Sequence, residues 1–145
     1  MQKLVLISCL IFLVACKQDL NQPFVAATPT DAAQINNSAV LDAFKNKKSD
    51  VFVEGSGVVK KLLPDDNKGA RHQKFLLTIS PEQILLFAHN IDLAPRVADL
   101  QVGDDISFRG EYVYNPKGGV VHWTHKAPQG DHAEGWIKHN GKTFQ

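Results

Sequence analysis

The stretch VFVEGSGVVKKL, residues 51–62, decides the fold that the sequence predicts. Apolar and polar side chains alternate in it, which is typical of a strand with one buried face. Gly55 and Gly57 lie in the middle of this strand and have no side chains. Two such positions allow the bulge or sharp bend that a small closed sheet needs. The stretch therefore predicts a long, bent first strand in a mainly β domain.

Short runs of the same kind follow along the chain and are separated by turn residues. Four of them predict further main strands, at residues 71–79, 83–89, 105–114 and 119–124. Residues 90–100 form a longer connection that can hold a short helix or a turn. The domain is thus predicted to have five main strands, with a linking segment between the third and the fourth.

Two shorter elements are predicted at the ends of this domain. Residues 135–144 form a final hairpin, because Asn140-Gly141 supplies the positive φ of a type I′ turn. At the other end, Thr30 or Asp31 can cap a helix that runs to about residue 47. The apolar residues that fall near one face of this helix are Ile35, Leu41 and Phe44.

Five strands with a linking segment between the third and the fourth describe an OB-fold barrel. The patterns Gly57-x-Val59 and Phe75-x-Leu77 and the stretch VGDDISFRG, residues 102–110, resemble the small bacterial OB-fold proteins that are exported to the periplasm. The predicted fold is mainly β: a small five-stranded OB-fold-like barrel with an N-terminal helix and a C-terminal hairpin. The alternative is another small antiparallel barrel or a sandwich. A fold by itself transfers no function.

The N-terminal residues predict where the protein works. Met1-Gln2-Lys3 is followed by an apolar run of about ten residues and then by Leu13-Val14-Ala15-Cys16. This arrangement resembles a bacterial lipoprotein signal. The resemblance implies cleavage before Cys16 and a diacylglycerol, with acyl chains such as palmitate, on the Cys16 sulfur. An uncleaved membrane helix is the alternative, but the run is far shorter than the roughly 20 residues that span a bilayer.

The lipoprotein resemblance divides the chain into a signal peptide at residues 1–15, a polar lipid-anchored tether at residues 16–30 and a single domain at residues 31–145. Lys17, rather than an aspartate, follows Cys16. In an envelope with two membranes, similar lipoproteins generally move on to the outer membrane. We therefore expect a lipid-anchored protein of the bacterial cell envelope, in the outer membrane and facing the periplasm.

Cysteine content and charge narrow the expected partners. The signal removes Cys9 and the lipid uses Cys16, so no disulfide framework remains. Removal of Lys3 leaves 15 basic and 15 acidic side chains. Tight binding to a nucleic-acid backbone draws on many phosphate contacts, so nucleic acid is not favoured as a partner. The membrane, through the lipid on Cys16, is the partner that the sequence predicts.

A ligand site is predicted from the position of polar side chains on the expected fold. OB-folds bind along their second and third strands and at nearby loops. Phe75 and Leu77 share the presumed core face of the second strand, so His72 and Lys74 share its outer face. Such a cationic and imidazole-bearing surface suits an anion or a polar saccharide, and a solvated face is the alternative. The predicted ligand-binding residues are Arg71, His72, Lys74 and His89.

All six histidines lie from position 72 onward, a clustering that a metal site or an acid–base site would produce. The best local candidate for a divalent metal such as zinc is His122-x-x-His125 with His132 after a turn. Residues three apart on a regular strand point to opposite faces, so His122 and His125 converge only if the strand ends or bends at Thr124. We favour the alternative, in which His122 makes a hydrogen bond beside Trp123 and fixes the C-terminal segment.

Trp123 and Trp136 allow two interpretations. If exposed, they are stacking platforms for a base or a sugar; if buried, they anchor the C-terminal tail. Their large apolar area favours burial. Asp65-Asp66 could coordinate a hard cation, but the two adjacent carboxylates lack the alternating spacing of a calcium loop. A turn is the better interpretation.

Arg71-His72-Gln73 and the stretches AHNIDLAPR (residues 88–96) and GGVVHWTH (residues 118–125) resemble an uncharacterised family of small bacterial exported proteins, over roughly residues 50–145. This resemblance implies no activity. The leading hypothesis is a membrane-tethered periplasmic OB-fold binding module for a polar or anionic ligand. The alternative is a metal-assisted hydrolase of the phosphodiesterase or nuclease type, with His72 as acid or base. No Ser-His-Asp order, nucleophile elbow or phosphate loop is present, and the residues do not decide whether the protein is an enzyme.

Overall fold

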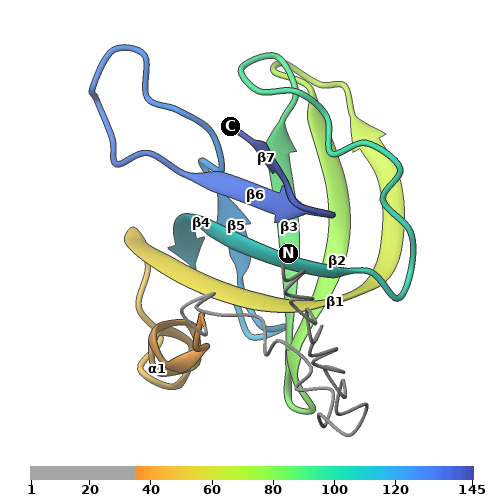
Figure 1. Cartoon of the computed structure of the whole chain (residues 1–145). Coiled ribbons are helices and arrows are strands. Elements are labelled where there is room, and N and C mark those ends of the chain that lie inside the picture. The colour runs from red at the N-terminus through yellow and green to blue at the C-terminus, as the bar shows by residue number, and fades with distance from the viewer. Residues whose placement is uncertain (1–34) are drawn as a thin grey trace, which may run out of the picture. The chain divides into compact units, whose positions relative to one another are not determined.

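The computed structural model describes residues 35–145. The predicted signal, the tether, Cys16 and the predicted helix cap lie outside these residues. The described part contains one helix and seven strands (Figure 1). The helix lacks the length and apolarity needed to cross a membrane. The elements are α1 (Ser38–Lys45), β1 (Val51–Asp66), β2 (His72–Ser80), β3 (Gln83–Asn90), β4 (Asp105–Val113), β5 (Val120–His122), β6 (Trp136–His139) and β7 (Lys142–Phe144).

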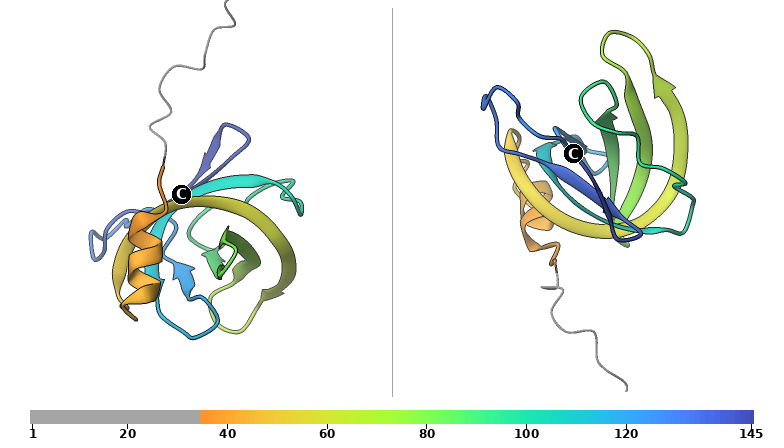
Figure 2. Two further views of the ribbon diagram at one scale, coloured as in Figure 1. Left: turned by 90° about the horizontal axis from the view of Figure 1, so that it is seen from below. Right: turned by 45° about the horizontal axis from the view of Figure 1, so that its top comes forward.

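The seven strands form one mixed sheet, and five of them close into a ring. The order is β1-β2-β3-β5-β4-β6-β7, and β4 pairs again with β1. Figure 2 shows this ring end on, with the long strand β1 curving around it. The β3–β5 pair is parallel, whereas the other pairs within the ring are antiparallel. The hairpin β6–β7 extends the sheet beyond β4.

The curvature of β1 depends on its two glycines. β1 pairs with β4 over residues 51–58 and with β2 over residues 58–66. A Cβ atom on Gly57 would collide with the backbone of Thr78, and one on Gly55 would lie 2.8 Å from the Phe108 ring. The missing side chains therefore let β1 pass close to its neighbours, whereas the sequence predicts a bulge or sharp bend at these glycines. The irregularities in register lie later than the glycines, between residues 59 and 61 and between residues 63 and 66.

The interior of the ring is filled by alternate residues of its strands. Phe75 and Phe87 stack with their ring centroids 4.8 Å apart, and Phe108 meets Phe87 edge to face at the same distance. Full burial of one such side chain contributes about 1.5 to 3 kcal/mol. The fully buried residues around them include Leu77, Leu85, Tyr112, Val121 and Ile137. The outer faces of β2 and β3 are left for other roles.

The C-terminal hairpin is confirmed, but the predicted helix is corrected. Asn140 and Gly141 have φ values of 48° and 73°, as a type I′ turn requires. The helix begins only at Ser38, and it buries Val40 and Ala43, whereas Leu41 is 39% exposed.

The anchor of this helix is a side chain that the helical period does not reveal. The Asn37 amide donates to the Ser56 carbonyl at 2.9 Å and accepts from the Ser56 N–H at 2.8 Å. These two bonds hold the chain against β1 just before the helix begins. Of the three residues predicted to face inward, Phe44 is partly buried and packs against the core, Leu41 is exposed and Ile35 precedes the helix.

Candidate functional site

A pocket of about 200 Å³ lies on the outer side of the ring. Strands β2, β3 and β5 contribute to it, together with the segment that follows β5 and one residue of the β3–β4 connection. We call it the histidine pocket, because four of the six histidines line it. Its lining residues are His72, Ala88, Asn90, Leu93, His122, Trp123, His125, Asp131 and His132.

Strand alternation explains why the residues from β2, β3 and β5 meet on the outside. His72 lies opposite Asn90 in the β2–β3 pair, and the next pair, Gln73 and His89, is buried. Side chains alternate between the two faces of a sheet, so His72 and Asn90 point outward. His122 likewise follows the buried Val121, which pairs with Phe87. The outer position of His72 is therefore confirmed.

A turn at Trp123 adds the remaining histidines to the pocket. Strand β5 ends at His122, and Trp123 has a φ of 50°, which is uncommon for a bulky residue. The chain then passes through the buried Thr124, and the Gly135 N–H donates to the His125 carbonyl at 2.8 Å. His122 and His125 were expected to converge only if the strand ended or bent at Thr124. The strand ends at His122, two residues earlier than predicted, and both histidines line the pocket.

Hydrogen bonds fix the protonation pattern of the pocket. Nδ1 of His125 lies 2.7 Å from the Lys126 carbonyl, and Nδ1 of His132 lies 2.8 Å from the Ala133 carbonyl. A carbonyl only accepts, so each Nδ1 donates and each Nε2 is an acceptor in the neutral ring. When such a ring gains a proton, Nε2 becomes a second donor. Nε2 of each ring can therefore accept a hydrogen bond from a ligand when the ring is neutral and donate one when the ring is protonated.

His122 differs from these two rings because it has a carboxylate partner. Its Nε2 lies 3.0 Å from Oε1 of Glu111, which is the residue opposite His122 in the β4–β5 pair and is nearly buried. The ring centroids of His122 and Trp123 are 5.3 Å apart. His122 therefore makes a hydrogen bond beside Trp123, as the favoured alternative expects, but its partner lies on β4 and not in the C-terminal segment.

The three histidines that the sequence predicts as metal ligands all line the histidine pocket, and binding of zinc by them stays a prediction. In the part of the chain that the structure describes, no three His, Cys, Asp or Glu side chains are placed to hold a metal ion. The rings of His125 and His132 meet edge to face, with centroids 5.1 Å apart, and His132 stacks on Trp123 at 4.5 Å. His122 donates to Glu111 instead. Proximity of the three histidines is correctly predicted, but aromatic stacking and hydrogen bonds orient their rings.

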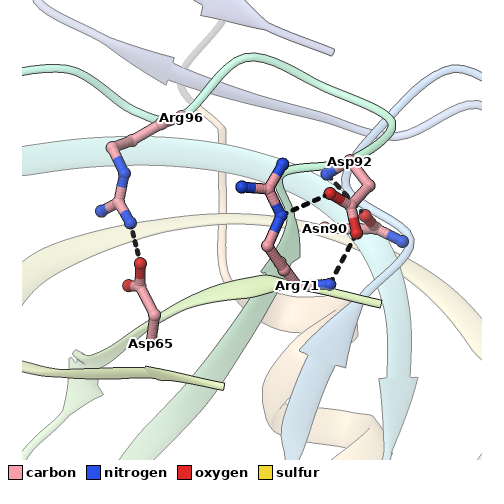
Figure 3. Close-up of polar contacts among 5 residues, drawn as sticks. All are labelled: Asp65, Arg71, Asn90, Asp92 and Arg96. Carbon is pink, nitrogen blue, oxygen red and sulfur yellow. Dashed lines mark hydrogen bonds and ion pairs between the residues drawn. The ribbon is translucent and has the colours of Figure 1, made fainter. Parts of the chain in front are cut away.

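Arg71 lies beside His72 in sequence but is occupied by a carboxylate. Its backbone N–H and its Nε donate to the two oxygens of Asp92, both at 2.7 Å, as Figure 3 shows. The backbone and side-chain hydrogen bonds from Arg71 hold the pKa of Asp92 below its usual range. Asn90 accepts from the Asp92 N–H at 2.9 Å, which leaves the Asn90 amide NH₂ for other partners. The pair positions the β3–β4 connection at the rim of the pocket.

Lys74 belongs to a different cavity, of about 270 Å³, between β1, β2 and the β3–β4 connection. Its Nζ is 3.9 Å from Asp66, and Asp65 forms an ion pair with Arg96 in the same region (Figure 3). The predicted preference for a turn at Asp65-Asp66 needs amendment, since both residues belong to the end of β1. Lys74 and His72 share the outer face, as predicted, but they do not share a pocket.

His89 is buried behind the histidine pocket. Its Nε2 is 3.0 Å from the Pro95 carbonyl and its Nδ1 is 2.7 Å from Oγ1 of Thr124. The carbonyl accepts, so Nε2 donates and Nδ1 accepts from the threonine hydroxyl. Burial lowers the pKa of His89, and the Pro95 hydrogen bond offsets this only in part. This neutral ring joins β3, the β3–β4 connection and the turn after β5, so it positions the pocket rather than facing a ligand.

The tryptophans separate into two environments. Trp123 is 36% exposed and lines the histidine pocket, so the prediction of burial is wrong for this residue. Trp136 is half-buried, with Nζ of Lys138 4.6 Å from its ring centroid. The sequence analysis also missed Asn90 and Asp131. Strand alternation from His72 could have identified Asn90, whereas no local signal marks Asp131.

The fold and the pocket define a class of protein: a small mainly β domain with an imidazole-lined surface pocket. Residues 23–145 match the family described as “Protein of unknown function (DUF3465)”, and the chain belongs to this family. A search of curated proteins found no match. Membership of an uncharacterised family is confirmed, and the match begins nearer to the N-terminus than the predicted residues 50–145.

Proposed function

We propose that the protein is a binding module for a small polar or anionic ligand, and that the histidine pocket is its binding site. The observation that supports this most strongly is the convergence of His72, His122, His125 and His132 from β2, β5 and the segment after β5. Pockets with a few convergent polar groups are the usual form of a small-ligand site.

The chemistry of the lining residues suits an anion. A carboxylate or phosphate in the pocket favours the positively charged form of the rings, because opposite charges attract. Nε2 of His125 and Nε2 of His132 then both donate to the ligand, since each Nδ1 is bonded to a carbonyl. Trp123, which is 36% exposed and stacks on His132, offers apolar surface for a sugar or a planar ring. Asp131 is the single acidic residue in the lining.

The proposal includes an OB-fold-like barrel and a position at the membrane. The five-strand ring and the connection between β3 and β4 support the barrel. OB-folds bind along their second and third strands, and β2 and β3 contribute His72, Ala88 and Asn90 to the pocket. The N-terminal sequence supports a lipid on Cys16, which would hold the module at the periplasmic face of the outer membrane.

Imidazole NMR tests the site directly. Long-range ¹H–¹⁵N spectra are recorded during titration with inorganic phosphate and with glucose, at pH 6 and pH 8. The signals of the four pocket histidines should move with a single Kd, and phosphate should bind more tightly at pH 6. His139, which bonds Asp104 on another part of the sheet at 2.8 Å, is the internal control. Equal movement of His139, or no movement of the pocket signals with either probe, would show that the proposal is wrong.

The metal-assisted hydrolase is tested by elemental analysis of protein purified without nickel resin. The described geometry brings no three ligands together, so we expect less than one zinc per ten chains and no change in Tm with chelator. Stoichiometric zinc whose removal lowers Tm would favour the hydrolase over the binding module, because a bound divalent metal activates water near neutral pH.

A further inference from the structure

A third cavity, of about 300 Å³, lies on the outer face of the ring and is lined mainly by aliphatic side chains. Leu63 of β1, Leu76 of β2, and Ile84 and Leu86 of β3 form its apolar walls. The β4–β5 connection completes it with Asn115, Lys117 and Gly119. We call this cavity the apolar groove. None of its lining residues is shared with the histidine pocket.

The groove departs from the usual pattern of an antiparallel sheet. Such a sheet normally packs one face in the core and presents a polar face to water. Here Leu76 and Leu86 lie opposite each other, and both alternate with fully buried residues that fill the interior. This part of β2 and β3 is therefore apolar on both faces. A concave surface lined mainly by apolar side chains, with a few polar groups at its border, is the usual form of a small-ligand site.

The wall on the β4–β5 side is held in place by hydrogen bonds. The Gly118 carbonyl accepts from the Gln83 amide at 2.9 Å and from the Tyr112 hydroxyl at 3.1 Å. Burial raises the pKa of Tyr112 to about 12, so its hydroxyl stays protonated. The Leu86 N–H donates to the Gly119 carbonyl at 3.0 Å. These bonds make the groove a preformed site, as small-ligand sites usually are.

The charged residue in the lining of the groove is a lysine. Lys117 lies in its lining, which contains no Asp or Glu. Lys61 pairs in register with Leu76 and is exposed, and residues directly opposite each other share a face. The ion pairs among residues 35–145 involve neither lysine. An occupant that suits this surface has an aliphatic body and an anionic end.

The size of the groove bounds the length of that body. Its volume of about 300 Å³ is at the lower end of the range for small-ligand sites, which favours a medium-length chain over a long one. We propose that the apolar groove binds a single-chain anionic amphiphile, a medium-chain fatty acid in monomeric form, with its chain on Leu76, Ile84 and Leu86 and its carboxylate at Lys117. This site is independent of the histidine pocket and of the function proposed for it.

Calorimetric titration of the protein with hexanoate, octanoate, decanoate and octanol tests this site, below the micellar concentration of each probe. Each added methylene should tighten the Kd by roughly fourfold up to decanoate, because each buries further apolar area. Octanol should bind more weakly than octanoate, since it lacks the charge that Lys117 recognises. Absence of decanoate binding, or a Kd that does not depend on chain length, would overturn the proposal.

Two variants separate the contributions of the chain and of the charge. Leu86→Gln should weaken binding of decanoate and of octanol at least tenfold. Lys117→Glu, on a surface connection away from the core, should weaken decanoate at least fivefold and leave octanol unchanged. Lys142→Glu, the matched control on β7, should change neither Kd. Equal losses in Lys117→Glu and Lys142→Glu would refute the recognition of charge at the groove.

A membrane surface is the competing source of acyl chains, and sedimentation with phosphatidylglycerol vesicles distinguishes it. We expect wild-type protein and Leu86→Gln to sediment with vesicles to the same extent, because the groove takes a monomer. The opposite result is that wild-type protein binds vesicles, Leu86→Gln does not, and neither binds decanoate in solution. That result would identify the groove as a membrane-docking surface and overturn the proposal.

Discussion

The outer face of β3 is divided into two halves with opposite chemistry. Ile84 and Leu86 line the apolar groove, whereas Ala88 and Asn90 line the histidine pocket. The residues opposite them on β2 change in the same way, from Leu76 facing Leu86 to His72 facing Asn90. This face of β3 thus passes from the apolar Leu86 to the polar Asn90 over about 13 Å, at the rise of an extended strand.

The two halves also receive their walls from the two ends of one short strand. The connection before β5 borders the groove, and the turn after β5 borders the histidine pocket. Both segments contain residues in the left-handed region, with φ of 123° at Gly118, 105° at Gly119 and 50° at Trp123. The conformations beside β5 therefore build both cavities, and substitutions there should disturb one half without the other.

The largest effect is expected for Gly119→Ala, which disturbs the groove. A Cβ atom here would collide with the Tyr112 ring, and φ at this residue disfavours any side chain. Strain and overpacking together should lower the free energy of unfolding by at least about 3 kcal/mol. The measurement is urea denaturation. Gly141→Ala is the matched control, because its φ is also positive but no atom lies within 4 Å, and it should cost about 1 kcal/mol. Equal costs would show that the packing against Tyr112 contributes nothing.

Thr124→Val should disturb the other half. It removes the hydroxyl that donates to Nδ1 of His89 and leaves a buried acceptor unpaired. The expected loss in unfolding free energy is about 1 to 3 kcal/mol. Thr143→Val, an exposed position on β7, should stay within about 0.5 kcal/mol. Imidazole signals of the histidine pocket should shift in Thr124→Val while decanoate affinity stays unchanged. A shift in decanoate affinity instead would mean that the two halves are coupled.

The pH dependence of stability should follow His89. Burial lowers the pKa of His89 in the folded protein, and an unfolded histidine titrates near pH 6.5. Below that pH the unfolded chain binds a proton that folded His89 does not, so stability decreases as the pH falls from about 6.5 toward the folded pKa. His89→Gln should reduce the slope of unfolding free energy against pH in this window by up to about 1.4 kcal/mol per pH unit. Identical slopes for the two proteins would contradict this origin.

The smallest effect is expected for Arg71→Ala. The side chains of Arg71 and Asp92 are 58% and 36% exposed, and exposed ion pairs contribute little to stability. We expect the Tm to be nearly unchanged and the phosphate Kd at the histidine pocket to remain within twofold of wild type. A tenfold loss of phosphate affinity with an unchanged Tm would restore Arg71 as a ligand-binding residue.

Local signals in the sequence were sufficient for most of the β structure. Alternation located the strands to within a few residues, and Asn140-Gly141 identified the last hairpin, because both depend on neighbours in the chain. The exposed face of β2 was also predicted, since side chains alternate on a strand. The helix was predicted less well. The hydrogen bonds of Asn37 to Ser56 join residues 19 apart, and no helical period contains that information.

The composition of the site depended on contacts across the sheet. The sequence determined that all six histidines lie from position 72 onward and that His72 points outward. Only the tertiary structure decided that Arg71 donates a hydrogen bond to Asp92 and that the buried His89 accepts one from Thr124. It also decided that Leu76 and Leu86 form an apolar wall outside the core. The physical reason is range: alternation and turn chemistry act between adjacent residues, whereas pairing of charges and enclosure of a cavity depend on which distant segments the ring brings together.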